Sequence, residues 1–345
     1  MPTVLELFNH REVLNYLQNR QYPELLGAKL FPETKKPTLD FDLIKGAGRT
    51  PVIASVHAFD TEAEIGSREA SKIALEAALI KRKMQLTEKE IIALESPRNA
   101  AEQQYLMQNV YNDIDALVAG VNARVEAMRM EVLAKGTVTL NENGLNAVVD
   151  YGVPAENKEA LAGTAVWTDK DNSDPIADMQ RWADSLATRP SRILTSTKVL
   201  GTLLSHPKII SALFGKDSGR VASRNDLNAF LTQLELPTIA VYDAKYRRQE
   251  KDGTYTQHRY FPENSFVMLP DGVLGETLFG PTAEELRKQW AESNSLTVRQ
   301  LQIEARTLEL TGVSDVLESS LNGVDSNIIL GANQVPVLGT VTLYE

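Results

Sequence analysis

The feature that most constrains the fold is one long stretch with the pattern of an uninterrupted helix. From Pro97 to Lys135 there is no further proline, and apolar residues recur at spacings of three and four residues. Such spacing places them on one face of an α-helix. They are Val110, Ile114, Leu117, Val121, Val125, Met128 and Val132. We predict a single helix about 58 Å long, at the standard rise of ~1.5 Å per residue, with Ser96 as its N-cap, Pro97 at its first position and Gly136 as its stop.

A helix of this length also occurs in coiled coils and helical bundles, which is the alternative interpretation. No second helix of matching length comes after it in the sequence, so a bundle would lack a partner.

Just before the long helix, Thr87 and Glu90 have the spacing of a capping box, which predicts a separate short helix. At the N-terminus, apolar residues near one face predict an amphipathic helix over residues 3–20 within an N-terminal arm.

Between the arm and the long helix lies a segment without a continuous apolar face. Residues 33–70 contain several glycines and prolines, and the apolar residues between Leu39 and Leu43 alternate with polar ones, as in a strand. Loops this long in an ordered protein are usually functional or disordered. We therefore predict an extended excursion that has no core of its own. Residues 71–86 have helical propensity, but the run from Ile80 to Leu86 alternates, which favours a strand that returns from the excursion.

The remainder of the chain alternates between short strands and helices, which predicts an α+β fold. We expect strands at 137–140, 146–151, 192–197, 238–248, 254–260, 266–269, 328–330 and 337–343, and helices at 174–186, 198–214, 223–235 and 282–290. Residues 153–172 are predicted to be loop. The pairs Asn143-Gly144 and Asp252-Gly253 are typical of hairpin turns.

Composition excludes several classes of protein. The chain has 345 residues, a net charge of −10 and no cysteine. The lack of cysteine rules out disulfides, thiolate metal sites and cysteine nucleophiles. The negative net charge argues against a protein that coats nucleic acid by neutralising phosphates. The N-terminus lacks the pattern of a signal peptide, and no stretch approaches ~20 uncharged apolar residues, so we expect no membrane span.

No arrangement of residues supports catalysis, so we predict no enzyme activity, no cofactor and no metal site. The loop from Gly46 to Pro51 is similar to a dinucleotide-binding loop but lacks its third glycine. The acidic residues Asp169, Asp171 and Asp174 lack the glycine and the closing glutamate of an EF-hand loop, so a solvated loop is expected. The four histidines are scattered singly along the chain: His10, His57, His206 and His258.

The charge is distributed unevenly along the chain. Residues 192–263 carry 11 Lys or Arg against 7 Asp or Glu, a net of +4, and residues 264–345 carry 4 against 11, a net of −7. This indicates either separate surfaces with different neighbours or an ordinary solvated mosaic. Over residues 242–260, tyrosines lie among lysines and arginines. That mixture favours cross-strand aromatic pairs in a hairpin, with binding of single-stranded nucleic acid as the alternative.

Four segments resemble parts of the lambda-type phage major capsid protein E family. Residues 57–68, HAFDTEAEIGSR, resemble the extended-loop signature of that family, and so do residues 80–88, IKRKMQLTE. Residues 260–269 resemble the family's strand after the central hairpin, and residues 335–343 its C-terminal strand. The order of the predicted elements also resembles the Hong Kong 97 phage capsid fold (HK97-like fold). The resemblance spans essentially the whole chain.

The resemblance implies a division of the chain into five parts. These are an N-terminal arm at 1–33, an extended loop at 34–87, a peripheral domain with a spine helix at 88–190, an axial domain at 191–312, and a return to the peripheral domain at 313–345. The extended loop is then expected to lie over a neighbouring subunit. The residues expected to form this subunit interface are His57, Phe59, Asp60, Glu62, Ile65, Arg68, Lys81, Arg82 and Lys83. Side chains alternate along a strand, so at least one cation of the run Lys81–Lys83 should face a neighbour, at an acidic site such as that near Asp113 and Asp115.

The implied function is that of a major capsid protein in a tailed double-stranded DNA phage or prophage. Its implied partners are further copies of itself in pentamers and hexamers, a separate scaffold protein, a portal, a decoration protein, and packaged DNA in non-specific contact with the inner surface. The implied location is the virion, with assembly in the host cytoplasm and no membrane association. Two alternatives stay open: an encapsulin-like nanocompartment shell with the same fold, and a soluble enzyme.

Overall fold

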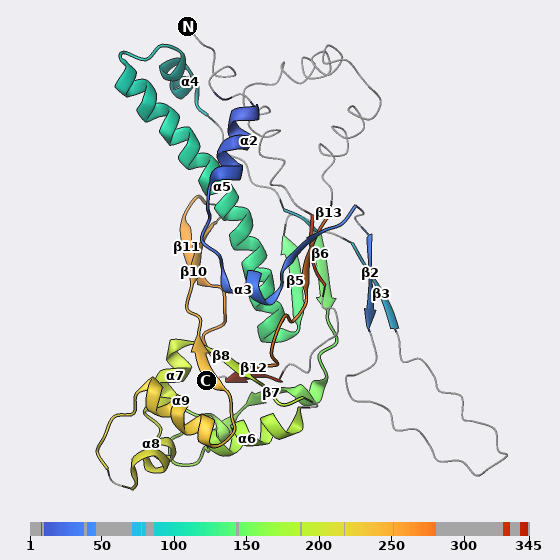
Figure 1. Ribbon diagram of the computed structural model, residues 1–345, viewed down its shortest axis with the longest axis vertical. Coiled ribbons are helices and arrows are strands. Elements are labelled where there is room, and N and C mark those ends of the chain that lie inside the picture. The colour runs from blue at the N-terminus through green and yellow to red at the C-terminus, as the bar shows by residue number, and fades with distance from the viewer. Residues whose placement is uncertain are drawn as a thin grey trace, which may run out of the picture.

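The computed structural model shows a chain arranged around one long central helix (Figure 1). It describes residues 8, 10–37, 40–45, 71–76, 78–80, 86–142, 145–186, 188–216, 218–250, 252–280, 327–331 and 339–343. Helices and strands are mixed along these residues, so the predicted α+β class is confirmed.

The central helix α5 runs from Ala100 to Lys135 and has 36 residues, which corresponds to about 54 Å. All seven positions of the predicted apolar stripe are buried in it. Gly136 ends the helix in the left-handed conformation, with φ of 69°, as predicted. The predicted start is wrong. Asn99 is the N-cap and accepts a hydrogen bond of 2.8 Å from the backbone N–H of Glu102, whereas Ser96 lies at the end of the preceding helix.

Two short helices cover the N-terminal half of α5. Helix α4, Glu88–Glu95, begins with the predicted capping box, in which Thr87 and Glu90 bond to each other's backbone N–H. Helix α2, His10–Asn19, confirms the predicted N-terminal helix over these residues; residues 3–7 and 9 lie outside the described residues. A hydrophobic cluster joins the three helices and consists of Phe8, Val13, Leu94, Val110, Ile114 and Leu117.

The arm then crosses to the other half of α5 through α3, Leu26–Leu30. It ends in strand β1, Glu33–Lys35, at the edge of a four-stranded sheet of order β1-β13-β14-β4. The other strands of this sheet are β13, Glu276–Gly280, β14, Asn327–Gly331, and β4, Ala78–Leu79. Strand β14 was predicted, but β13 was not, because its five residues show no clear alternation. The sheet therefore joins the arm to segments far away in the sequence.

The predicted excursion was expected to start at residue 33, but residues 33–35 form β1 of the four-stranded sheet; a two-stranded antiparallel ribbon follows. Strand β2, Asp40–Lys45, pairs with β3, Ser71–Glu76. Strands β3 and β4 confirm the preference for strand over helix in residues 71–76 and 78–79, whereas residues 81–85 of the alternating run lie outside the described residues. The structure pairs the ribbon with no other described strand.

A second hairpin comes after α5, and one element beyond it was predicted wrongly. Strands β5, Thr137–Glu142, and β6, Leu145–Asp150, confirm the predicted hairpin. Residues 158–161, expected to be loop, form strand β7, between the 3₁₀ turns η1, Ala155–Asn157, and η2, Gly163–Ala165. The sequence of β7, KEAL, has no strand pattern of its own. It is a strand because it pairs in parallel with the distant β15.

The largest core surrounds a five-stranded sheet of order β7-β15-β12-β8-β9. Its central strand β12, Ser265–Leu269, is buried at every position. The other strands are β8, Arg192–Thr195, β9, Thr238–Val241, and β15, Gly339–Leu343. Trp167, Trp182 and Phe266 pack edge to face and tilted against one another in this core, with ring centroids 5.2–6.0 Å apart. The helices around the sheet are α6, Pro175–Ser185, α7, Thr197–Leu204, α8, Pro207–Phe214, and α9, Arg224–Gln233.

Two predicted elements in this region are each divided in two. The helix expected at 198–214 breaks between α7 and α8, because Pro207 starts a new helix that His206 caps. The strand expected at 238–248 breaks into β9, which stays in the large sheet, and β10, Lys245–Gln249, which among the described strands pairs only with β11, Tyr255–Arg259. The helix expected at 282–290 lies outside the described residues.

Candidate assembly surfaces

The predicted interface residues all fall outside the part of the chain that the structure describes. His57, Phe59, Asp60, Glu62, Ile65 and Arg68 belong to residues 46–70, and Lys81, Arg82 and Lys83 to residues 81–85. The structure does describe the strands that flank the first segment. It holds Lys45 of β2 directly opposite Ser71 of β3. Residues 46–70 therefore leave and rejoin the described chain at the same end of one ribbon.

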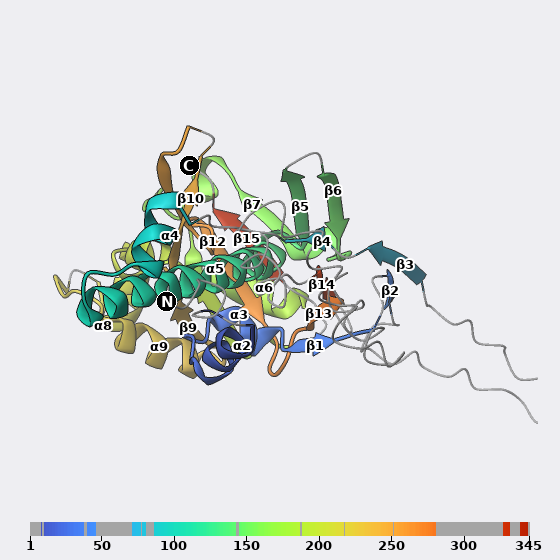
Figure 2. The same cartoon turned by 90° about the horizontal axis from the view of Figure 1, so that it is seen from above.

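The ribbon and the β10–β11 hairpin lie on opposite sides of the molecule. Both views place them on either side of that half of α5 which leads to β5 (Figure 1, Figure 2). In any head-to-tail arrangement of copies, opposite sides of neighbouring molecules meet. These two elements are therefore candidates for contact between subunits.

The hairpin has one face toward its own subunit. Arg248 forms an ion pair of 3.2 Å with Glu142 at the end of β5, and Glu142 also pairs with Arg124 of α5 at 3.2 Å. Nearby, the ring of Tyr246 lies 5.6 Å from that of His258 and 5.0 Å from that of Tyr260. The predicted cross-strand aromatic pairing is confirmed, and the ion pairs join the hairpin to β5 and α5.

The outward face of the hairpin is solvent-exposed and carries unpaired cations. Lys245, Arg247, Gln249, Tyr255 and Gln257 occupy alternate positions of the two strands and are exposed. The Arg247 guanidinium lies 5.5 Å from the ring centroid of Tyr255, which is 57% exposed. Within the described part of the chain, neither Lys245 nor Arg247 forms an ion pair. This face can accept an acidic partner.

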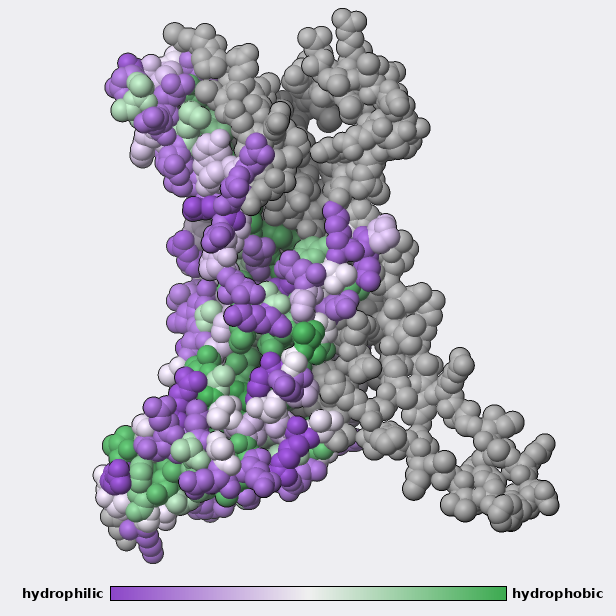
Figure 3. Space-filling model, viewed as in Figure 1, coloured by the Kyte–Doolittle hydropathy of each residue, from purple (hydrophilic) through white to green (hydrophobic). Residues whose placement is uncertain are grey.

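A third candidate surface lies beyond α8. On the face seen in Figure 3, apolar side chains gather at the lower left, around α8 and α9, and a second apolar group lies over the lower half of the spine. In the loop after α8, Val221 is 87% exposed, and the Arg220 guanidinium lies 4.2 Å from the ring centroid of Phe214. Exposed apolar groups that gather in this way are typical of surfaces that contact other proteins.

The first part of the arm is anchored to α5 at Asp115. Asp115 accepts hydrogen bonds from the Tyr16 and Tyr22 hydroxyls, at 2.8 and 2.9 Å, and pairs with Arg20 at 3.0 Å. Burial, followed by the hydrogen bond to Asp115, raises the pKa of Tyr22, so this phenol stays a donor. Asp115, which the sequence suggested as an acceptor for a neighbour's cations, is thus occupied by its own chain.

Asp113 and Glu90 form an acidic pair close to that anchor. Burial and then the nearby charge of Glu90 raise the pKa of Asp113. No ion pair joins either carboxylate to a cation among the residues that the structure describes. The sequence suggested an acidic site near Asp113 and Asp115. Asp115 is occupied by the arm, so Asp113, together with its neighbour Glu90, is the part that can still receive a cation.

A buried polar network joins the arm, α5 and the approach to the hairpin. Glu126 is fully buried and accepts hydrogen bonds from the Tyr242 hydroxyl at 2.7 Å and from the Gly27 N–H at 2.9 Å. Arg129 is 3% exposed and donates to Thr277 and to Glu33, each at 2.9 Å. The arm, the segment before β10 and strand β13 therefore all bond to one turn of α5. Sequence patterns missed this network, although two charged residues within the apolar part of the helix could have indicated it.

Gly27 permits the close approach of the arm to α5. A Cβ atom at this position would lie 2.4 Å from Glu126 Oε2 and 2.8 Å from Cδ of Arg129. Real Cβ atoms essentially never come so close, so any side chain would displace α3. This glycine is required by packing and not by its backbone angles.

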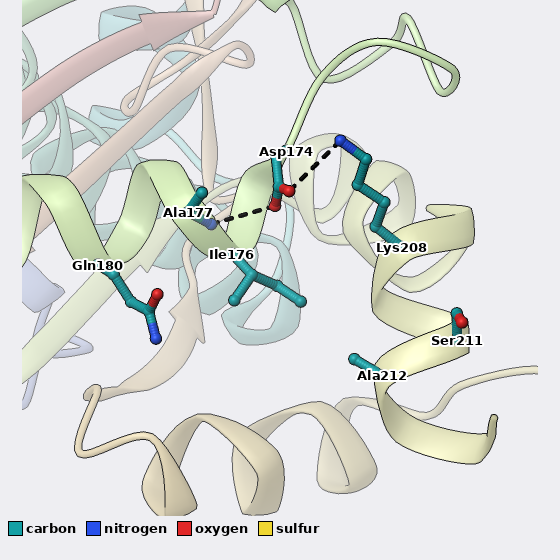
Figure 4. A pocket seen from close by; sticks show the side chains of 7 residues that line it. All are labelled: Asp174, Ile176, Ala177, Gln180, Lys208, Ser211 and Ala212. Carbon is teal, nitrogen blue, oxygen red and sulfur yellow. Dashed lines mark hydrogen bonds and ion pairs between the residues drawn. The ribbon is translucent and has the colours of Figure 1, made fainter. Parts of the chain in front are cut away.

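The expected solvated acidic loop has ordinary turn geometry. Asp169 accepts hydrogen bonds from Asn172, and Asp174 caps α6 through the Ala177 N–H at 3.1 Å and pairs with Lys208 at 3.3 Å (Figure 4). Among the described residues, no cluster of His, Asp and Glu side chains is placed to hold a metal ion. None of the described helices has both the length and the apolar character needed to cross a membrane.

Comparison with known proteins places these features in a family. The sequence profile of the phage major capsid protein E family matches residues 10–297, and a profile of the baseplate J-like protein C-terminal domain matches residues 283–344. No curated protein sequence gave a significant match. The second profile covers only a small part of the chain and assigns no family.

Comparison with solved structures identifies the fold through one match. A prophage protein from Escherichia coli CFT073, described as its capsid protein, is 15% identical with a TM-score of 0.52 and covers 98% of this chain and 99% of its own. A phage-related protein from Bordetella bronchiseptica RB50 is 16% identical with a TM-score of 0.42, covering 78% and 82%. The chain has the HK97-like capsid fold. Since the family profile matches most of the sequence, the chain belongs to the phage major capsid protein E family and is a structural protein of the phage head.

Proposed function

We propose that this chain assembles as pentamers and hexamers into the icosahedral head shell of a tailed double-stranded DNA phage or prophage. The observation that carries the proposal is the family match from residue 10 to residue 297. The arrangement of the described chain supports it. Residues 46–70 leave and rejoin the described chain on a ribbon that pairs with no other described strand, and we expect this segment to be extended. A segment without a core of its own gains burial only against a partner.

The division of the chain is part of this proposal. Residues 1–33 are the arm, 34–87 the extended loop, 88–190 and 313–345 the peripheral domain, and 191–312 the axial domain. The arm stabilises the peripheral domain, because its tyrosines bond Asp115 and its α3 packs on Glu126. The axial domain, which includes the apolar surface around α8 and α9, then meets its copies around the symmetry axes. Head-to-tail contacts of this kind close into rings.

The interface residues keep the roles predicted from the sequence. The segment that includes His57, Phe59, Asp60, Glu62, Ile65 and Arg68 contacts a neighbouring subunit. The run Lys81–Lys83 directs at least one cation toward a neighbour. The acidic pair of Glu90 and Asp113 is the acceptor that we propose for it, because neither carboxylate has a cationic partner in the described part of the chain.

The same function implies further partners. A separate scaffold protein directs assembly, a portal occupies one vertex, and a decoration protein binds the outer surface. Packaged DNA contacts the inner surface without sequence specificity, and the net charge of −10 keeps the shell from adhering to it through phosphate neutralisation. Assembly takes place in the host cytoplasm.

Electron microscopy of the overexpressed chain, with and without a scaffold protein, tests the proposal. Closed shells with icosahedral symmetry are expected. An encapsulin-like compartment is the second candidate, and nucleic acid in particles purified from the phage or prophage host distinguishes the two. A monomer or dimer under all conditions, including with scaffold, would overturn both.

A further inference from the structure

The exposed face of the β10–β11 hairpin has the chemistry of a docking surface for an acidic, extended segment. Residues 245–259 carry five Lys or Arg against two Asp or Glu, a net of +3. The outward face presents Lys245 and Arg247 without carboxylate partners among the described residues, together with Tyr255 and two glutamines. Arg259 lies opposite Lys245 on the same face, but its charge is taken up by Asp243 and Glu263. Exposed aromatic and arginine side chains are enriched where proteins contact one another. The hairpin stands as an isolated pair of strands in the described chain, so its edges can also pair with an added strand.

The chain itself contains a segment of matching charge. Residues 57–66 contain Asp60, Glu62 and Glu64 and no lysine or arginine, a net of −3. Alternate positions hold these three carboxylates, so in an extended conformation they would all lie on one side. The outward cations of the hairpin also alternate, at residues 245 and 247. Two extended chains with these spacings can bring their opposite charges into contact.

The positions of the β2–β3 ribbon and the β10–β11 hairpin favour contact between subunits over contact within one subunit. The ribbon that carries residues 46–70 and the hairpin lie on opposite sides of α5 in both views (Figure 1, Figure 2). In a head-to-tail ring, one patch of a subunit contacts a different patch of the next, so two elements on opposite sides of the molecule can meet between neighbouring copies. The hairpin is tied to α5 through Arg248, Glu142 and Arg124, so it is held in place before the partner arrives. A preorganised surface loses less entropy on binding.

We propose that the outward face of the β10–β11 hairpin receives the acidic segment 57–66 of a neighbouring copy, with Lys245 and Arg247 opposite Asp60, Glu62 and Glu64. This rests on the proposed shell function and adds to it the landing site of the extended loop. The contact is largely electrostatic, so it gives specificity and register to a shell whose subunits must choose one orientation. The exposed aromatic and basic residues of the hairpin are then explained by assembly and not by nucleic-acid binding.

Site-specific crosslinking tests the pairing directly, because the chain has no cysteine. The variant Glu62→Cys with Gln257→Cys is assembled and then oxidised. On non-reducing gels we expect a ladder of linked subunits that ends at five and six, because each copy is joined to the next around a ring. An equimolar mixture of the two single-cysteine variants should give dimers only. A fast-migrating monomer without a ladder would show contact within one chain and overturn the proposal, as would the absence of any crosslink in intact particles.

Charge reversal provides an independent readout. Lys245→Glu with Arg247→Glu should reduce the yield of closed particles at least tenfold, and adding Asp60→Lys, Glu62→Lys and Glu64→Lys to that variant should restore it. The control reverses two other exposed cations, Lys29→Glu and Lys135→Glu, and should leave the yield unchanged. Normal shells from the hairpin variant, an equal loss in the control, or no rescue by the swap would each overturn the pairing. If the unaltered chain forms no particles, the shell function fails instead.

Discussion

Tyr242 donates a hydrogen bond of 2.7 Å from its hydroxyl to Oε1 of the fully buried Glu126. This bond joins the segment that leads into the β10–β11 hairpin to the spine helix α5. Burial, and then the bond to Glu126, raises the pKa of Tyr242, so the phenol remains protonated through the physiological range. The same carboxylate oxygen holds Gly27 of the arm. One side chain of the spine therefore fixes both the arm and the base of the hairpin.

Removing the hydroxyl tests this role. Tyr242→Phe should lower the free energy of unfolding of the unassembled subunit by about 1–3 kcal/mol, because a buried carboxylate loses a donor and nothing replaces it. Urea denaturation of the free subunit measures the change. The control is Tyr255→Phe, whose ring is exposed and whose substitution should have no effect. Equal stability of the two variants would contradict the proposed importance of the buried bond.

Gly27 and Gly201 form a matched pair of helical glycines. Gly27→Ala would place a Cβ atom 2.4 Å from Glu126 Oε2, whereas nothing lies within 4 Å of a Cβ at Gly201. We expect Gly27→Ala to destabilise the subunit and to make the arm more sensitive to protease. Gly201→Ala should stabilise it by about 0.5–1 kcal/mol, since alanine favours helix. Thermal unfolding checks both, and a stabilising Gly27→Ala would mean that the arm does not pack as described.

The spine helix tolerates proline at its start but not in its middle. Val121→Pro removes a backbone hydrogen bond and clashes with the preceding turn, at a cost of about 3 kcal/mol or more, so we expect no soluble, assembly-competent protein. Ala100 is the first residue of α5, where proline fits, and Ala100→Pro should assemble normally. The soluble yield of both variants and electron microscopy of their particles check this prediction. Normal shells from Val121→Pro would rule out the continuous helix.

The basic run before α4 is expected to act in assembly and not in folding. Replacing Lys81, Arg82 and Lys83 together by glutamate should leave the thermal unfolding of the free subunit nearly unchanged but block closed shells. Glu90→Gln with Asp113→Asn should also lower the yield of closed shells if these carboxylates bind the cations of a neighbour's basic run. Unchanged particle yield from the triple variant would show that the run is an ordinary solvated one.

Elements whose sequence pattern involves only neighbouring residues could be predicted from the sequence. The stripe of α5, the Thr87 capping box and the stop at Gly136 each depend on neighbouring residues, and each is confirmed. Strand β7 was missed because its pairing partner β15 lies far along the chain. The network around Glu126 was missed for the same reason: its donors Gly27 and Tyr242 are distant in sequence. Long-range partners decide such features, and no local pattern contains them.

The predicted interface residues depend on the resemblance to a family more than on local physics. Charge and spacing mark Asp60, Glu62 and the cations of residues 81–83 as unusual, but they do not say what these side chains contact. The described chain adds the ribbon that presents residues 46–70 and the acidic pair Glu90–Asp113. Contacts between subunits are absent from any single chain, so they stay predictions.

Deleting residues 52–66 and joining the ends with a short glycine linker tests the central claim most directly. Because Lys45 and Ser71 are held opposite each other by the ribbon, the deletion can close without disturbing β2 or β3. A segment that buries little within its own chain contributes little to the stability of the monomer. We therefore predict a nearly unchanged melting temperature for the unassembled subunit and a complete loss of closed particles in electron micrographs. Limited proteolysis of the intact chain should cut residues 46–70 readily in free subunits and slowly in shells. An unfolded deletion variant, or normal shells formed without the segment, would contradict the account.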